Sequence, residues 1–319
     1  MTQPSSADMT FDSSLVDVQR SFSSTDTNTT SSTGKENMPP SDHSDPVSAP
    51  TSQFKDVSTD ELYSEWAATY DTDGNILQFI DDLQMTDLLE QFVSLCCAQD
   101  LDSNDYRLDI LDLGCGTGRN TLKLLQTPWP TDRDVNVHGW DGSQAMLDLA
   151  RTKCANAVSS SASTKMVMEF AAVDISNPEN VPKQYDDLFN GLISTLVLEH
   201  IEIETFFAIV ARLLKPGAHA LITNMHSDMG RLSRAGYKAA TGERYRATSY
   251  IYTPQETVEA AAAAGLDLVG EIDEVAVDGR MIDGGVLDNG VRVEKGGVRE
   301  GARKWVGTKV WYGMMLRKR

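Results

Sequence analysis

The chain is poor in the residues that stabilise secreted domains and membrane spans. Only four of its 319 residues are cysteine, and Cys96, Cys97, Cys115 and Cys154 form no CxxC pair. Their spacing argues against a disulfide framework and predicts a reducing compartment. No apolar stretch approaches the length of a membrane span, and the N-terminus lacks the apolar core of a signal peptide. We therefore expect a soluble cytoplasmic protein, with the nucleus as the alternative compartment.

Basic residues are also scarce. The chain has 28 Lys and Arg against 47 Asp and Glu, a formal net charge of −19. This balance argues against nucleic-acid binding, which requires clustered basic residues to neutralise phosphates. Two stretches depart from it, residues 230–246 and 291–304, which each carry five basic residues. They are either solvated loops or a positive rim that guides an anionic small molecule.

The first 50 residues contain no Trp or Tyr, but they contain 19 Ser or Thr and 5 Pro. Such a segment cannot bury enough apolar surface to become ordered. We therefore predict a disordered tail over residues 1–55 and a folded domain over residues 56–319. The first part of that domain, residues 58–97, is expected to form two helices.

The most informative segment is Leu111–Gly118, an apolar run that breaks into alternating glycines. Residues 109–113 predict a buried strand that leads into the glycines, and residues 120–126 after them have helical spacing. The glycines between them can take positive φ and allow a ligand to approach the backbone closely; they are Gly114, Gly116 and Gly118. The order of strand, glycine loop and helix predicts a nucleotide site.

The acidic residue at the entrance of this loop favours one kind of nucleotide. Asp112 would repel a pyrophosphate and attract an α-amino group. The chain also has no G-x-x-x-x-G-K-[ST] loop, which argues against a phosphate-binding P-loop.

Polar residues follow the next predicted strands in the same way. The strand over residues 135–140 precedes Asp141-Gly142-Ser143, and Asp141 can accept hydrogen bonds from two ribose hydroxyls. Asp141 could instead cap the helix that starts at Gln144, as could Ser143. The strand over residues 166–173 leads into Asp174-Ile175, and residues 188–195 lead into Leu198–Ile201.

Together these segments resemble the motifs of the class I S-adenosylmethionine (SAM) dependent methyltransferases. The resemblance implies an α/β, Rossmann-like fold with a seven-stranded, mostly parallel sheet and an antiparallel edge strand. It implies that Asp174 accepts the adenine amino group and that Ile175 lies against the ring. The full set of expected SAM-binding residues is Tyr70, Asp112, Gly114, Cys115, Gly116, Gly118, Asp141, Gly142, Ser143, Asp174, Ile175 and Thr195.

The segment Tyr63–Asp71 resembles the N-terminal lid of ubiquinone/menaquinone-type and Williams–Beuren-region-type methyltransferases. In that family the lid folds over the methyl donor. Tyr63, Trp66 and Tyr70 would then shield the sulfonium, since aromatic faces suit a cation. The alternative is a hydrophobic stripe that docks the helix on the core.

The remaining elements follow from periodicity and turn signals. They are helices over 75–97, 203–214 and 254–265, a Lys215-Pro216-Gly217 turn, and strands over 218–225, 266–277 and 309–316, the last two separated by a glycine-rich loop over 278–307.

The rate of methyl transfer depends mainly on the alignment of nucleophile, methyl group and sulfur and on the exclusion of water. The enzyme needs at most a general base in addition. His200 is the first candidate base, with Glu199 to orient it. The alternative is that this pair begins a helix and is structural. His226 is the second candidate.

A metal-dependent mechanism is the less favoured alternative. Some relatives bind a divalent ion through Glu-x-x-Glu-His, but Leu196 stands at the first position of that pattern here. Glu199, His200 and His226 would make an incomplete set, so we predict no metal.

The predicted function is methyl transfer from SAM to an O, N or C atom of a small-molecule acceptor. Two alternatives remain open. A protein or RNA methyltransferase would use the basic stretches for docking. A SAM-binding regulator without turnover would use the tail as an interaction arm.

Overall fold

The computed structural model describes residues 54–98, 107–130, 133–158, 165–233, 236–238 and 241–319. Most of the predicted tail, residues 1–53, lies outside these ranges, as does the connector over residues 99–106. Among the described helices, none combines the length and the apolar character that crossing a bilayer requires.

The core of the molecule is a seven-stranded sheet in the order β4-β3-β2-β5-β6-β12-β9. The strands are β2 (Arg107–Leu113), β3 (Asp134–Asp141), β4 (Met166–Ala172), β5 (Phe189–Thr195), β6 (Leu214–Met225), β9 (Leu266–Ala276) and β12 (Lys309–Lys318). The first five strands of this order pair in parallel, and β12 pairs antiparallel with both β6 and β9. The prediction of a mostly parallel sheet with an antiparallel edge is confirmed. The antiparallel strand is β12, which lies between β6 and the edge strand β9.

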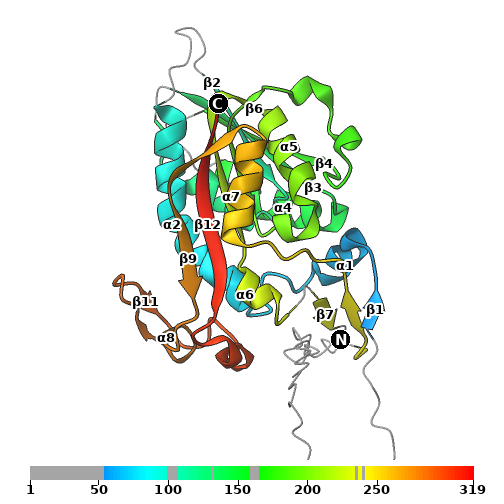
Figure 1. Cartoon of the computed structure of the whole chain (residues 1–319), viewed down its shortest axis with the longest axis vertical. Helices are drawn as coiled ribbons and strands as arrows, with labels where there is room; N and C mark the ends of the chain where they lie inside the picture. Colours follow the sequence, from blue (N-terminus) through cyan, green and yellow to red (C-terminus); the bar gives the residue numbers. More distant parts are fainter. Residues whose placement is uncertain (1–53, 99–106, 131–132, 159–164, 234–235, 239–240) are drawn as a thin grey trace, which may run out of the picture.

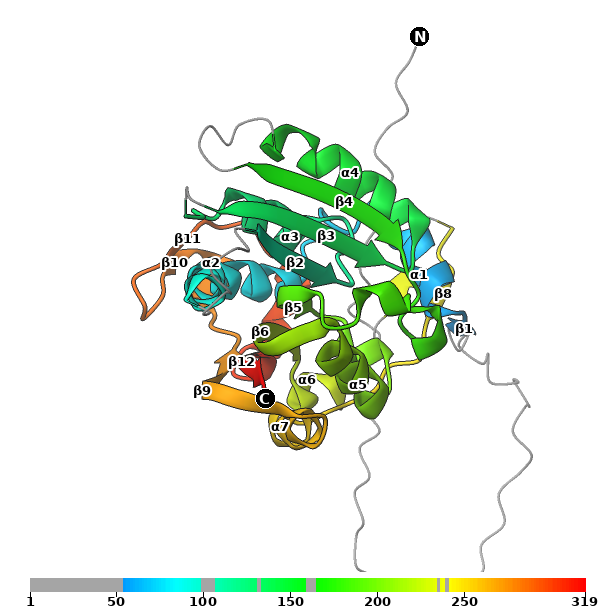
Figure 2. The ribbon, with the colours of Figure 1, turned by 90° about the horizontal axis from the view of Figure 1, so that it is seen from above.

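Helices cover both faces of this sheet (Figure 1, Figure 2). One face carries α2 (Ile76–Cys97), α3 (Arg119–Gln126) and α4 (Gln144–Val158), and the other carries α5 (Ile203–Leu213) and α7 (Pro254–Ala263). Because side chains alternate along a strand, Leu221 packs with the first group and Ile222 with the second. This two-sided burial explains why the central strands are apolar throughout.

A second, smaller sheet joins the start of the described chain to the segment after β6. It has the order β1-β8-β7, formed by β1 (Phe54–Asp56), β7 (Gly236–Lys238) and β8 (Arg244–Arg246). Arg246 Nε donates to Asp56 Oδ1 over 2.6 Å, and the Arg246 guanidinium lies over the Phe54 ring. We call this sheet and the following helix α1 (Thr59–Trp66) the cap. Strand β1 begins two residues inside the segment that was assigned to the tail.

The pairing of β1 with β8 predicts a difference between two truncated chains. Removal of residues 1–56 deletes β1 and exposes the edge of β8, whereas removal of residues 1–53 leaves the pair intact. We expect trypsin to cleave after Arg244 and Arg246 faster in the shorter chain, because β8 opens more often. Limited proteolysis with mass-spectrometric mapping measures the two rates. Equal rates would show that β1 does not hold β8 in place.

Two local expectations differ from the structure. The Lys215-Pro216-Gly217 segment, expected as a turn before a strand, lies within β6, where the pairing with β5 shifts register. The loop over 278–307 contains short elements that carry too few residues for a periodic pattern. They are α8 (Arg280–Asp283), β10 (Gly285–Val286), β11 (Arg292–Val293) and the 3-10 helix η5 (Glu300–Trp305), and buried Trp305 attaches them to the α2 side of the core.

Candidate active site

A cavity of about 400 Å³ lies at the carboxyl ends of β2, β3, β4 and β5, beneath the cap. The chain order reverses between β2 and β5, which is where open α/β sheets bind ligands. The residues that line this large cavity are Ser58, Thr59, Asp60, Tyr63, Tyr70, Gly114, Gly116, Asp141, Gly142, Ser143, Met146, Val173, Asp174, Ile175, Ser176, Thr195, Leu196, Val197, His200 and Ile201.

Most of the side chains predicted for the site meet in this cavity. Nine of the expected SAM-binding residues line it: Tyr70, Gly114, Gly116, Asp141, Gly142, Ser143, Asp174, Ile175 and Thr195. Asp112, Cys115 and Gly118 do not line this cavity, and their ligand contacts stay predictions. Gly118 precedes α3 with φ of 78°, and a Cβ there would lie 3.0 Å from Ala150.

Two glycines of the loop serve different purposes. Gly116 has φ of 52°, and an added Cβ would meet nothing within 4 Å, so its backbone borders open space. Gly114 has φ of 76°, and a Cβ there would lie 2.3 Å from Val197 Cγ2. Gly116 therefore leaves room for a ligand against the backbone, whereas Gly114 is required for the contact with the segment after β5.

Asp141 is held rigidly at the end of β3. Its Oδ2 accepts the Gly116 N–H over 2.8 Å, and its Oδ1 accepts the Ser143 N–H over 2.8 Å. Burial raises the pKa of this carboxyl. Each oxygen has capacity for a further hydrogen bond, so the side chain can fix the backbone turn and still receive two ligand hydroxyls.

Asp174 and Ile175 place a carboxylate beside an apolar surface. Asp174 Oδ1 accepts the Ser176 N–H over 2.9 Å and the Ser176 hydroxyl over 2.6 Å. Ile175 is buried against the core. The pair suits a flat heteroaromatic ring that carries a hydrogen-bond donor.

Asp112 is buried and faces α3 rather than the cavity. Its Oδ2 accepts the Thr121 hydroxyl over 2.5 Å, and its Oδ1 has no hydrogen-bond partner in the described part of the chain. Burial raises the pKa of this carboxyl from 3.8 to about 7. The side chain therefore links β2 to α3 through a hydrogen bond, and its ionisation is unfavourable because it is buried.

This raised pKa predicts a pH-dependent stability. An acid whose pKa is higher in the folded chain favours folding when protonated, so its contribution is complete below about pH 4 and is lost as the pH rises through about 7. Asp112→Asn keeps an acceptor for Thr121 but does not ionise. We expect this variant to be more stable than wild type at pH 8, by on the order of 2 kcal/mol, and to lose that advantage near pH 4. Urea unfolding at both pH values measures it, and an equal difference at both would contradict the prediction.

The cap and the segment that follows it bring three aromatic rings over the site. The ring centroids of Tyr63 and Trp66 lie 5.9 Å apart, those of Tyr63 and Tyr70 5.7 Å, and those of Trp66 and Tyr70 5.1 Å. Trp66 Nε1 donates to Asp73 Oδ2 over 3.0 Å, and the hydroxyls of Ser64 and Ser143 lie 3.1 Å apart. Helix α1 ends at Trp66, so Tyr70 lies beyond the helix that was expected to carry it.

His200 and Glu199 lie in the 3-10 helix η4 (Leu198–His200). His200 Nε2 lies 3.4 Å from Glu199 Oε1 and 2.8 Å from the Tyr63 hydroxyl. His200 lines the large cavity, whereas Glu199 lines a second, smaller one. The two side chains thus face adjoining spaces.

His226 lines neither cavity. Its Nδ1 accepts the Asp228 N–H over 3.0 Å, and its Nε2 lies 3.0 Å from Glu274 Oε1. Both ring nitrogens are therefore engaged in capping the short helix α6 (Ser227–Gly230) and in holding β9. Within the described residues, no group of three or more His, Cys, Asp or Glu side chains is arranged to hold a metal ion.

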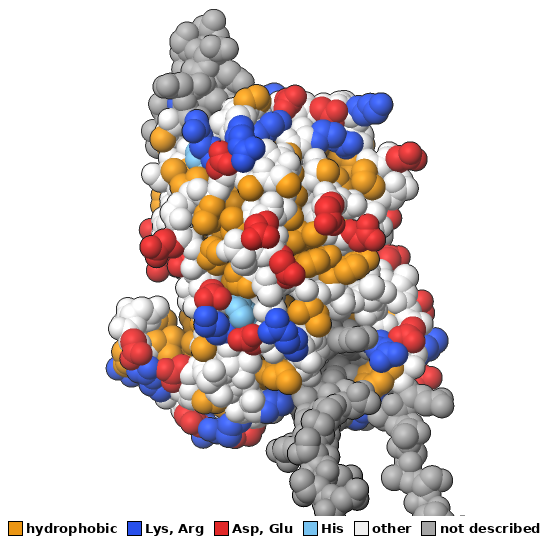
Figure 3. Space-filling view, viewed as in Figure 1, with side chains coloured by type: hydrophobic (Ala, Val, Ile, Leu, Met, Phe, Trp, Pro, Cys, Tyr) orange, Lys and Arg blue, Asp and Glu red, His pale blue; other side chains and the backbone are white. Residues whose placement is uncertain are grey.

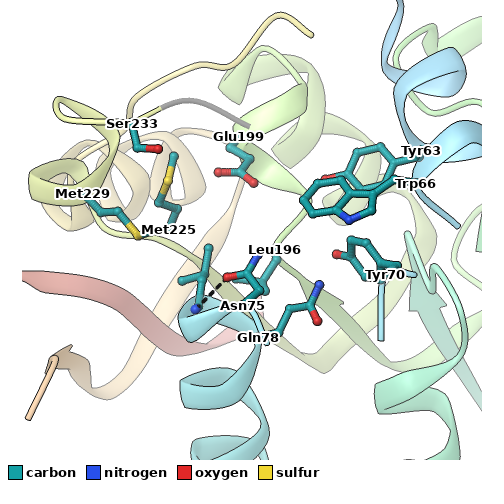
Figure 4. A pocket seen from close by; sticks show the side chains of 11 residues that line it. Tyr63, Trp66, Tyr70, Asn75, Gln78, Leu196, Glu199, Met225, Met229 and Ser233 are labelled. Carbon is teal, nitrogen blue, oxygen red and sulfur yellow. Dashed lines mark hydrogen bonds between the residues drawn. The ribbon is translucent and has the colours of Figure 1, made fainter. Parts of the chain in front are cut away.

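The smaller cavity, which we call the small pocket, has a volume of about 40 Å³. Its lining residues are Tyr63, Trp66, Tyr70, Asn75, Leu77, Gln78, Leu196, Glu199, Met225, Met229 and Ser233 (Figure 4). Tyr63, Tyr70 and Leu196 also line the large cavity, so the two spaces adjoin.

Sequence reasoning missed a buried network behind the site. Asn120 Nδ2 donates to Thr195 Oγ1 over 2.9 Å and to Asp81 Oδ2 over 2.8 Å. The fully buried Asp81 carboxylate also pairs with Arg119 over 2.6 Å. Its Oδ1 accepts from Thr223 and Trp311. The available signal was the acidic pair Asp81-Asp82 in the helix over residues 76–97.

The fold and this site define a nucleoside-binding protein of the Rossmann-like methyltransferase type. The family model described as "Methyltransferase domain" matches residues 110–217. The chain is 36% identical over 269 residues to "Uncharacterized methyltransferase AN0656" of Emericella nidulans, covering 81% of this chain and 90% of that protein. Over 87 residues it is 39% identical to a malonyl-[acyl-carrier protein] O-methyltransferase of Acetivibrio thermocellus, covering 27% of this chain and 25% of that protein.

A similar fold occurs in the crystal structure of the [4+2]-cyclase SpnF. The TM-score is 0.51 at 17% identity, covering 81% of this chain and 94% of that one. The family model and the relative from Emericella nidulans place the chain among the class I SAM-dependent methyltransferases, enzymes that take their methyl group from SAM.

Proposed function

We propose that the enzyme methylates a small molecule whose reacting end enters the small pocket. The observation that carries this proposal is the small size of that pocket. It offers about 40 Å³ under the cap, walled by Trp66, Leu77, Met225 and Met229. A space this narrow admits the end of a metabolite more readily than a folded surface.

The large cavity is the proposed SAM site. Asp141 would receive the ribose hydroxyls, and Asp174 and Ile175 would receive the adenine. Gly116 and Gly142, where an added Cβ meets nothing within 4 Å, leave room against the backbone. When bound, SAM supplies a methyl group on an electron-poor sulfonium.

The chain's own residues would align the acceptor and remove its proton. Tyr63, Tyr70 and Leu196 line both spaces, so they would flank the point where acceptor and methyl group meet. His200 would take a proton through Nε2, which lies against Tyr63 and Glu199. The aromatic cap would exclude water.

The basic stretches give weak support to a macromolecular substrate. Arg303 pairs with Asp283 and Glu300, and Arg246 pairs with Asp56, so part of the positive charge is neutralised within the chain. On the face in Figure 3, acidic side chains accompany the basic ones. No residue of either basic stretch except Ser233 lines the small pocket among the described residues.

The test uses full-length enzyme and SAM with a deuterated methyl group. The enzyme is incubated separately with a metabolite extract, a protein extract and total RNA, and the label is located by mass spectrometry. Label in a metabolite supports the proposal. Label confined to protein or RNA overturns it, and firm binding of S-adenosylhomocysteine without any transfer would favour a non-catalytic regulator.

A further inference from the structure

The small pocket contains a buried carboxylate that the donor site does not use. The Glu199 side chain is 7% exposed, and its Oε2 has no hydrogen-bond partner in the described part of the chain. Its Oε1 lies 3.4 Å from His200 Nε2. The carboxylate points into the pocket (Figure 4). A buried acceptor without a partner is costly, so this oxygen is matched to a hydrogen-bond donor on a ligand.

The surroundings of Glu199 favour a hydrogen-bond donor that carries a positive charge. The described residues that line the small pocket include no Lys or Arg. They do include Tyr63, Trp66 and Tyr70, whose ring faces attract cations. An acceptor carrying a carboxylate or phosphate at its reacting end would face the Glu199 charge with no compensating cation.

We propose that the methyl acceptor is an amine whose nitrogen is bound by Glu199 in the small pocket, beside the rings of Tyr63, Trp66 and Tyr70. The proposal rests on the proposed small-molecule function. It replaces the expected anionic acceptor with one that is cationic at its reacting end, and it assigns Glu199 a direct contact with substrate.

The volume of the pocket limits what enters. One water needs about 10–15 Å³ on this measure, so about 40 Å³ holds about three water-sized groups. A short primary alkylamine such as n-propylamine, whose nitrogen and first two carbons would fill this space, is therefore a suitable probe of the reacting end. A larger substrate would extend beyond the pocket with the rest of its body.

The reaction balances with groups that are present. The Glu199 carboxylate accepts one proton from the ammonium, which frees the nitrogen lone pair. SAM, when bound, would supply the methyl group to that lone pair: the N–C bond would form as the C–S bond breaks, and the positive charge would pass from the sulfur to the methylated nitrogen. His200 Nε2, next to Glu199 Oε1, can then carry the proton onward.

The first experiment uses ligand-observed NMR to measure the binding of n-propylamine, 1-propanol and propionate. The enzyme is first saturated with S-adenosylhomocysteine. We expect saturable binding of n-propylamine and none of propionate. Glu199→Gln should weaken n-propylamine binding by about tenfold or more, the effect of losing a hydrogen bond to a charged group. Glu202→Gln changes an exposed acid that lines neither cavity, and it should leave n-propylamine binding within about twofold. If the wild-type enzyme bound n-propylamine and propionate equally well, the proposal would be overturned.

The second measurement locates the deuterated methyl group in products formed from the metabolite extract. Label on an amine nitrogen, lost in Glu199→Gln while S-adenosylhomocysteine still binds, supports the proposal. Label on oxygen or carbon of a metabolite overturns the amine inference and leaves the small-molecule function intact. Label found only in protein or RNA would overturn both the amine inference and the small-molecule function.

Discussion

Asp141→Ala is expected to weaken SAM binding by on the order of 100-fold. Two ribose hydroxyls would each donate to a charged carboxylate, and a hydrogen bond to a charged group contributes about 1.5–3 kcal/mol. The substitution also removes the acceptor of the Gly116 and Ser143 N–H groups, which shapes the turn around the ligand. Isothermal titration calorimetry with SAM measures the effect.

Two further variants separate ligand binding from folding. Asp141→Asn keeps one oxygen acceptor, so its affinity should fall between those of wild type and Asp141→Ala. Asp148→Ala changes an exposed residue of α4 that pairs only locally with Arg151, and it should bind like wild type. If Asp141→Ala retained both full affinity and its melting temperature, the ribose assignment would be wrong.

Asp81→Leu is expected to destabilise the protein by about 3–5 kcal/mol, the cost of leaving a buried charge without its partner. The substitution would leave Arg119 with only the half-exposed Asp82, over 2.7 Å, and would leave Asn120, Thr223 and Trp311 without their shared acceptor. The free energy of unfolding in urea measures the loss.

Neighbouring residues supply the controls for this prediction. Asp82→Ala removes the more exposed partner of the same arginine and should cost less than about 1 kcal/mol. Asp81→Leu combined with Arg119→Met replaces the buried ion pair by apolar groups and should recover much of the loss. Equal effects of Asp81→Leu and Asp82→Ala would show that the network contributes little.

The donor side of the site could be predicted because its residues occupy fixed places beside strand ends. Asp141 and Asp174 each follow an apolar run directly, and parallel strands bring their carboxyl ends to one edge of the sheet. Asp112 differs from these two residues, because it lies one residue before the end of β2 and its side chain faces α3; its contact with the ligand stays a prediction. Which face a strand residue occupies depends on the helices that pack there.

The acceptor side could not be predicted in this way. The small pocket combines Trp66 from the cap, Leu77 from α2, Glu199 from η4 and Met229 from α6. No spacing along the chain relates these positions. Likewise, Asp81 is recognisable as a network centre only after α2 packs against Thr223 of β6 and Trp311 of β12.

The sequence by itself determined the family, the parallel sheet and the placing of Asp141, Asp174 and His200 at the donor cavity, because strand periodicity and glycine turns are local properties of the chain. Only the tertiary structure decided that β1 pairs with β8 to form the cap and that Glu199 faces a narrow aromatic pocket beside that cavity. Those features arise from contacts between distant segments, whose pairing depends on how all the buried surfaces fit together.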